Sequence, residues 1–163
     1  MNSLLFTILS IIALFYQVLT INEVTLLNYV PNILIAILIY SHFHLNLTFH
    51  TILFFMIGLA LDTSNPPLFG TFTLTFMILS YLITIVRSHI DLRILANKLV
   101  LILVCNSIVY LLYYLFVGLT YNQDFLSLLI AFIVGTLLNT IISIIIVGIL
   151  DFINLLKLEH PDV

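Results

Sequence analysis

Charged residues are scarce in this sequence, which has four Lys or Arg and seven Asp or Glu among its 163 residues. Hydrophobic residues make up 63% of the chain, and the mean hydropathy is +1.32. A water-soluble domain of this size would aggregate with so apolar a surface. The composition therefore predicts an integral membrane protein with no soluble domain and no nucleic-acid partner.

The sequence also lacks the patterns of common catalytic and metal sites. Cys105 is its one cysteine, which excludes a disulfide within the chain and a cysteine-based metal site. It has no G-x-S-x-G, no H-E-x-x-H, no glycine-rich phosphate loop and no pair of acids within an apolar run. We therefore expect a protein that is not an enzyme and uses no cofactor or metal.

Three histidines flank one of the apolar segments, namely His42, His44 and His50. Two of them stand one residue apart on a short connection, and no carboxylate or thiolate lies near them in sequence. This is a weak signal for a metal site. We interpret the three as residues at the level of the lipid headgroups.

Long apolar runs divide the chain into six segments, because about 20 apolar residues cross the hydrocarbon core as a helix. The runs are continuously apolar, so they do not fit the alternating strands of a membrane barrel. The opening stretch MNSLLFTILSIIALFYQ has no Lys or Arg and no small-residue cleavage site, so we interpret it as a retained helix. We predict an all-α integral membrane protein, a six-helix transmembrane bundle that forms one domain over 1–163. The predicted spans are 4–21, 30–41, 45–61, 67–86, 99–119 and 125–150.

The segment 30–41 is shorter than a full span, so we expect a short or partly re-entrant helix there. Orientation follows from the basic residues, which stay on the cytoplasmic side during insertion. With six spans and a cytoplasmic N-terminus, all of them lie inside: Arg87, Arg93, Lys98 and Lys157. A five-span alternative, in which 30–41 does not cross, moves the N-terminus outside. In both arrangements the 87–98 connection is a cytoplasmic loop, which faces anionic headgroups or docks a partner.

Polar residues recur at helical spacing within three of the predicted spans. The stripes are Ser3, Thr7, Ser10 and Gln17; Asn106, Tyr110 and Tyr114; and Gly135, Asn139 and Ser143. Lipid cannot satisfy such groups, so they turn toward other helices or a cavity. Two interpretations remain open. The stripes pack the helices together, or Gln17, Asn106 and Asn139 line a pocket for a lipid or another ligand.

The stretch GLALDTSNPPLFGTFTLTF at 58–76 holds Asp62, the one charged residue between Glu23 and Arg87. We expect Asp62 at the end of the third helix, one of the two prolines after it at the start of the fourth, and Gly70 where the two helices approach closely. Its carboxylate would accept hydrogen bonds from free N–H groups at the start of the fourth helix. A contact between the same acid and a partner or ligand is the alternative.

These motifs resemble a known family. The order of PNILIAILIY at 31–40, GLALDTSNPPLFGTFTLTFMILSYLI at 58–83 and a short basic loop before two closing spans is similar to MreD, the bacterial rod shape-determining membrane protein family. That family has a proline followed by an acid or amide, then a glycine and an aspartate closing the third helix, then a glycine opening the fourth. The residues at those places are Pro31, Asn32, Gly58, Asp62 and Gly70.

The resemblance implies a non-enzymatic scaffold subunit of the cell-elongation complex in the bacterial inner membrane, in contact with membrane lipid. Its implied partners are MreC, which has a single membrane helix, the actin-like MreB, the glycosyltransferase RodA and the penicillin-binding transpeptidase of RodA. MreD is also similar in fold to the substrate-binding subunits of energy-coupling factor vitamin transporters. Such a subunit is the alternative function, although the A-x-x-x-A type of docking motif is absent from this sequence.

Overall fold

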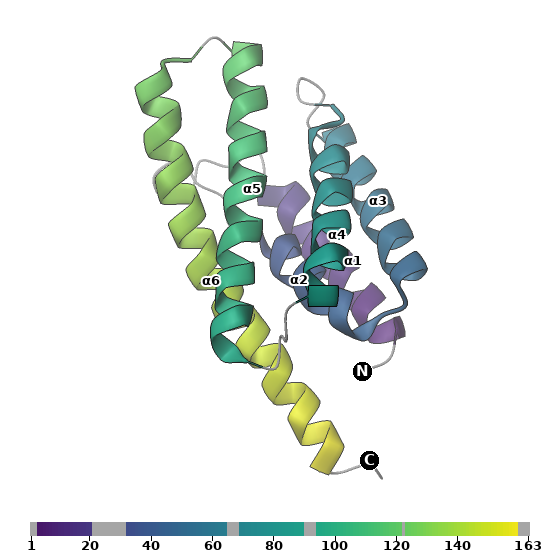
Figure 1. Ribbon diagram of the computed structural model, residues 1–163. Helices are drawn as coiled ribbons and strands as arrows, with labels where there is room; N and C mark the ends of the chain where they lie inside the picture. The colour runs from purple at the N-terminus through teal and green to yellow at the C-terminus, as the bar shows by residue number, and fades with distance from the viewer. Residues whose placement is uncertain (1–2, 21–31, 65–68, 90–93, 122, 160–163) are drawn as a thin grey trace.

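The computed structural model describes residues 3–20, 32–64, 69–89, 94–121 and 123–159. The described chain is all-helical, as predicted (Figure 1). Its helices are α1 (Ser3–Thr20), α2 (Ile33–His44), α3 (Leu47–Ser64), α4 (Thr71–His89), α5 (Leu95–Tyr121) and α6 (Phe125–Glu159). The four helices α3 to α6 contain stretches that are long and apolar enough to cross a membrane. The fold is therefore compatible with a membrane bundle.

The short helix α2 lies at the centre of the bundle and contacts each of the other five helices. Every side chain from Leu34 to His42 is buried. Such complete burial explains why this segment reads as an uninterrupted apolar run with no polar face. Its 12 residues rise only about 18 Å, so α2 is the short helix that the sequence predicts.

Helix α6 is longer than predicted. It continues nine residues beyond 150, to Glu159, and Figure 1 shows this yellow end projecting past the other helices. The added stretch DFINLLKLE contains no glycine or proline, and the next proline is Pro161. The end of the apolar run at 150 marks a change of environment, but nothing at that point stops a helix.

The junction between α3 and α4 corrects two predictions. Asp62 does not end α3, which continues to Ser64, and α4 begins only at Thr71. The two prolines expected to start α4, Pro66 and Pro67, lie outside the described residues. The position of the prolines therefore did not predict where α4 starts.

The close approach of α3 and α4 occurs at Gly58 and not at Gly70. A Cβ atom on Gly58 would lie 2.7 Å from the Cα atom of Thr73, whereas a Cβ on Gly70 would meet nothing within 4 Å. Gly70 instead has a φ of +92°, which L side chains rarely adopt. Gly58 therefore permits helix contact, and Gly70 permits the turn that leads into α4.

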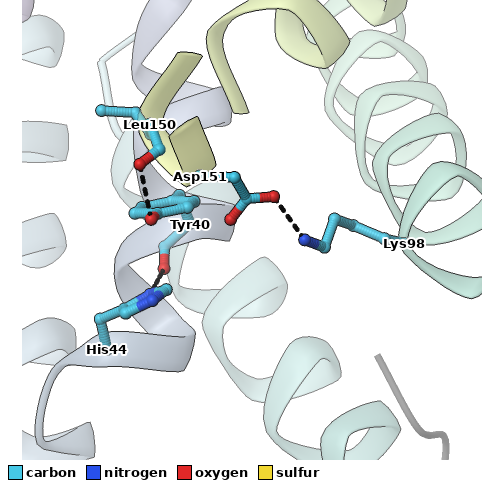
Figure 2. Close-up of polar contacts among 5 residues, drawn as sticks. All are labelled: Tyr40, His44, Lys98, Leu150 and Asp151. Carbon is cyan, nitrogen blue, oxygen red and sulfur yellow. Dashed lines mark hydrogen bonds and ion pairs between the residues drawn. The ribbon is translucent and has the colours of Figure 1, made fainter. Parts of the chain in front are cut away.

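Polar contacts gather several helix ends at one end of the bundle. The Arg87 Nη1 of α4 donates a hydrogen bond of 2.9 Å to the carbonyl oxygen of His42, in the last turn of α2. The Lys98 Nζ of α5 lies 2.6 Å from the Asp151 carboxylate of α6 (Figure 2). In the same view the Tyr40 hydroxyl donates a bond of 3.0 Å to the Leu150 carbonyl oxygen.

The start of α1 lies at this same end, because the ring of Phe6 is 6.1 Å from the ring of His44. Arg87 and Lys98 thus share one end of the bundle with the first turn of α1, as the six-span prediction requires. Arg93 lies outside the described residues. The side of the membrane that this end faces remains a prediction.

Two of the three histidines are buried among the helices. His42 and His50 are 2% and 0% exposed, and their rings meet edge to face with centroids 4.7 Å apart. The His50 Nε2 donates to the Leu38 carbonyl oxygen at 3.3 Å, and Ser80 Oγ lies 3.3 Å from its Nδ1. Neighbouring helices therefore cover both rings, so neither faces lipid directly. Their level relative to the lipid headgroups stays a prediction. His44 is exposed and stacks on Tyr40.

We predict that Gly58→Ala destabilises the protein by about 1 to 3 kcal/mol, because the added methyl group must displace the backbone at Thr73. Gly148→Ala is the matched control. It lies in α6 with open space around it, so the change is expected to be neutral or to stabilise by up to about 1 kcal/mol. Unfolding in detergent micelles measures both, and equal stability of the two variants would contradict the assigned contact.

We also predict that His89, at the end of α4, and Gln123, before α6, lie on opposite sides of the membrane, with His89 in the cytoplasm. Single cysteines at these positions in a Cys105→Ser background report this through a membrane-impermeant thiol reagent applied to intact cells. Gln123→Cys should react and His89→Cys should not. The reverse pattern would show that the orientation is inverted.

Candidate functional site

Asp62 is completely buried, with an exposed fraction of 0%. Its Oδ1 accepts a hydrogen bond of 2.9 Å from the Phe72 backbone N–H. Its Oδ2 accepts one of 3.0 Å from the Thr73 backbone N–H and one of 2.5 Å from the Thr73 hydroxyl. Both amides belong to the first turn of α4, where N–H groups have no acceptor within the helix. The bonds that the sequence predicted for Asp62 are therefore present.

This geometry explains how a single acid is accommodated among apolar side chains. A buried carboxylate is costly unless its oxygens receive hydrogen bonds, and here three donors converge on them. The partial positive charge at the start of α4 also favours a negative group. Because the acid belongs to α3 and its donors to α4, Asp62 caps one helix from another and fixes their relative position.

Three asparagines form a second buried group where α2, α5 and α6 meet. The Asn32 backbone N–H donates to the Asn139 Oδ1 at 2.8 Å. The Asn139 Nδ2 donates to the Asn106 Oδ1 at 2.5 Å and lies 3.4 Å from the Asn32 carbonyl oxygen. All three residues are at least nine-tenths buried. The structure thus brings together three of the predicted site residues.

The asparagine group continues along the stripes of α5 and α6. The Asn106 Nδ2 donates to its own helix at the Ile102 carbonyl oxygen, at 3.0 Å, and to the Ser143 Oγ at 3.3 Å. These bonds join α5 to α6 through side chains that the spacing had placed on facing stripes. For Asn106, Asn139 and Ser143 the packing interpretation of the stripes is confirmed.

The group lies inside the bundle and not at its end. Asn139 precedes Asp151 by twelve residues of α6, a rise of about 18 Å from the Lys98–Asp151 ion pair. Helix α2 therefore starts deep in the protein. Asn32 is its N-cap residue, but the Asn32 side chain makes no capping bond. The Asn32 Oδ1 and the Thr136 Oγ1 are buried and have no hydrogen-bond partner among the described residues.

The remaining predicted residues fall elsewhere. Gln17 and Ser10 of α1 are 4% and 0% exposed, so this polar stripe faces inward, as expected. Whether Gln17 shares a pocket with the asparagines stays a prediction. Pro31 lies outside the described residues. Gly58, Asp62 and Gly70 belong instead to the contact between α3 and α4 and to the turn that joins them.

The sequence analysis missed two polar partners. Thr73 supplies two of the three bonds to Asp62, and Ser80 lies against His50. Both are threonine or serine residues within an apolar helix, where such hydroxyls commonly bond to their own backbone. The sequence does not distinguish Thr73 and Ser80 from other serine and threonine residues in apolar helices. Their roles become visible only when α3 and α4 are seen packed together.

We predict a graded loss of stability on substitution of Asp62. Both carboxylate oxygens of Asp62 accept bonds from backbone N–H groups. An amide nitrogen at either position would face a donor, so Asp62→Asn should cost about 1 to 3 kcal/mol, and Asp62→Ala should cost more. Thr73→Val, which keeps its N–H and loses only the hydroxyl bond, should cost about 1 kcal/mol.

Unfolding in micelles and membrane abundance measure this series. The order Ala, Asn, Val from the most to the least destabilised supports the cap. If Asp62→Asn retains full stability and loses partner recovery, the negative charge has a binding role that the cap does not explain.

The chain was compared with protein-family models, with curated proteins and with solved structures, and none of the three comparisons gives a match. The similarity to MreD therefore rests on the motifs of the sequence, and membership of that family stays a hypothesis.

Proposed function

We propose that this protein is a non-enzymatic scaffold subunit of the MreD type, which binds partner proteins within the bacterial inner membrane and helps to direct sidewall peptidoglycan synthesis. Its partner in the bilayer is an MreC-like protein with a single membrane helix. Through that partner it works with MreB, RodA and the penicillin-binding transpeptidase of RodA.

The observation that supports this proposal most directly is the Asp62 cap. The acid that the family pattern places at the end of the third helix has all its bonds directed into the first turn of α4. Gly58 and Gly70, the two glycines of the same pattern, serve the same junction. The residues of this motif together hold α3 and α4 in a fixed position. A scaffold needs such rigidity, because a partner recognises the shape of the scaffold's surface.

The alternative is a substrate-binding subunit of an energy-coupling factor vitamin transporter, and one observation favours it. The Asn32 Oδ1 and the Thr136 Oγ1, the latter three residues before Asn139 on α6, are buried and have no hydrogen-bond partner in the part of the chain that the structure describes. A small polar ligand would satisfy such atoms. The direct bonds between Asn106 and Asn139 weigh against it, because they use groups that a ligand would need.

Co-purification separates the two functions. We predict that the full chain, extracted in mild detergent from a strain that also expresses an MreC-like bitopic protein, recovers that protein. Each interhelical hydrogen bond contributes only about 0.6 to 2 kcal/mol, so many packing contacts must add to hold the pair.

The control is Gly58→Ala, which disturbs the α3–α4 junction and should recover less partner per folded molecule than Gly148→Ala. Recovery of an ATPase module or of a bound vitamin, with no bitopic protein, would contradict the scaffold function and favour the transporter subunit.

A further inference from the structure

Tyr81 is a polar residue on the outer surface of α4, far from both ends of that helix. It is 69% exposed. The other exposed tyrosines in the described residues are Tyr16, four residues before the end of α1, and Tyr121, the last residue of α5. Those two stand where tyrosine rings gather at a membrane–water interface. Tyr81 does not.

The depth of Tyr81 follows from the helix rise. It lies ten residues after Thr71 and eight before His89, or about 15 and 12 Å from the two ends of α4. Side chains in a helix lean toward its N-terminus, so the ring of Tyr81 leans away from the His89 end. In a bilayer with a hydrocarbon core of about 30 Å, its hydroxyl is near the middle.

The Tyr81 hydroxyl differs from most of the serine and threonine hydroxyls on the surface of the bundle. Each of seven exposed or half-exposed serine and threonine side chains bonds to a carbonyl oxygen one turn earlier in the chain. They are Thr51, Thr63, Thr84, Ser88, Ser107, Thr120 and Ser127. A tyrosine hydroxyl is held too far from its own backbone for such a bond. Within the described chain no hydrogen bond involves the hydroxyl of Tyr81.

An acyl chain cannot supply the missing bond, because it has no acceptor or donor at that depth. The exposed side chains around Tyr81 on the same face of α4 are apolar until the last turn of the helix, at spacings of 3, 4 and 7. They are Leu74, Met77, Ile78 and Ile85. Ser88 and the half-exposed Thr84 also lie on this face, but each bonds to a carbonyl oxygen of α4. Among the described residues of this face, Tyr81 is therefore the one whose hydroxyl is left without a hydrogen bond.

We propose that this face of α4 binds a transmembrane helix of the partner protein, with Tyr81 hydrogen-bonded to a polar side chain of that helix near the middle of the bilayer. The inference rests on the proposed function, which supplies a partner with one membrane helix. The complementary residue on that helix is an Asn, Gln, Ser, Thr or Glu, because its own backbone groups are used within the helix. Met77 adds a flexible, polarizable contact beside it.

The test combines a hydroxyl deletion with crosslinking, in the full chain co-expressed with the bitopic partner. Tyr81→Phe should lower the recovery of the partner by about 3- to 20-fold, the range that one interhelical hydrogen bond gives. Tyr121→Phe, which removes an exposed hydroxyl at a helix end, should leave recovery unchanged. The abundance of both variants should equal that of the unmodified chain, because neither hydroxyl bonds within the described protein.

A photoreactive amino acid at Ile85, next to Tyr81 on the same face, should crosslink the partner. The same group at Leu137, which is 55% exposed on α6, should not. Crosslinks from Ile85 to lipid only, or to a second copy of this chain, would overturn the inference, as would full recovery of the partner by Tyr81→Phe. In each of those cases the unmodified chain still recovers the partner, so the proposed function stands. If the unmodified chain recovers no bitopic protein, the proposed function fails, and the inference fails with it.

Discussion

Helix starts inside an apolar bundle need acceptors for their free N–H groups, and this need accounts for two of the buried polar residues, Asp62 and Asn139. Two helices start where water is excluded. The first turn of α4 receives the carboxylate of Asp62 from α3, and the start of α2 receives the side-chain oxygen of Asn139 from α6. In both cases the acceptor belongs to another helix. Satisfying a backbone group therefore also fixes how two helices pack.

The two acceptors differ in charge, and the difference has a physical reason. Asp62 faces two backbone N–H groups and a hydroxyl, all of which are donors, so a group that only accepts suits its position. Asn139 must accept from Asn32 and donate to Asn106, which an amide does and a carboxylate cannot. The residue type at each place follows from the balance of donors and acceptors around it.

The sequence predicted the features that depend on local pattern. The all-helical fold and the six segments follow from apolar runs, and the bonds of Asp62 follow from an isolated acid close to a helix start. Features that depend on tertiary position were not predictable. The close contact of α3 with α4 was assigned to Gly70 and lies at Gly58, because only the pairing of the two helices shows which glycine is at the contact.

The histidines show the same limit. His42 and His50 border apolar runs in the sequence, and the sequence does not show that other helices cover them. Both are buried, because α2 is surrounded by the other helices and His50 of α3 packs against it. Likewise, an apolar run that ends at 150 predicts where a span ends, while the helix itself continues to Glu159. An apolar run shows which residues avoid water. Where the helix ends depends instead on residues that stop a helix, such as glycine and proline.

Burial and exposure give polar residues in this chain two different meanings. Asn106 and Asn139 lie in the interior and bond to each other, so their presence is explained by the fold of a single chain. The hydroxyl of Tyr81 lies on the surface of α4, where the fold provides no partner and lipid provides none either. A phenylalanine would fill the same surface without an unmet hydrogen bond. The fold of this chain alone therefore does not account for tyrosine at position 81, whereas the proposed partner helix on that face would.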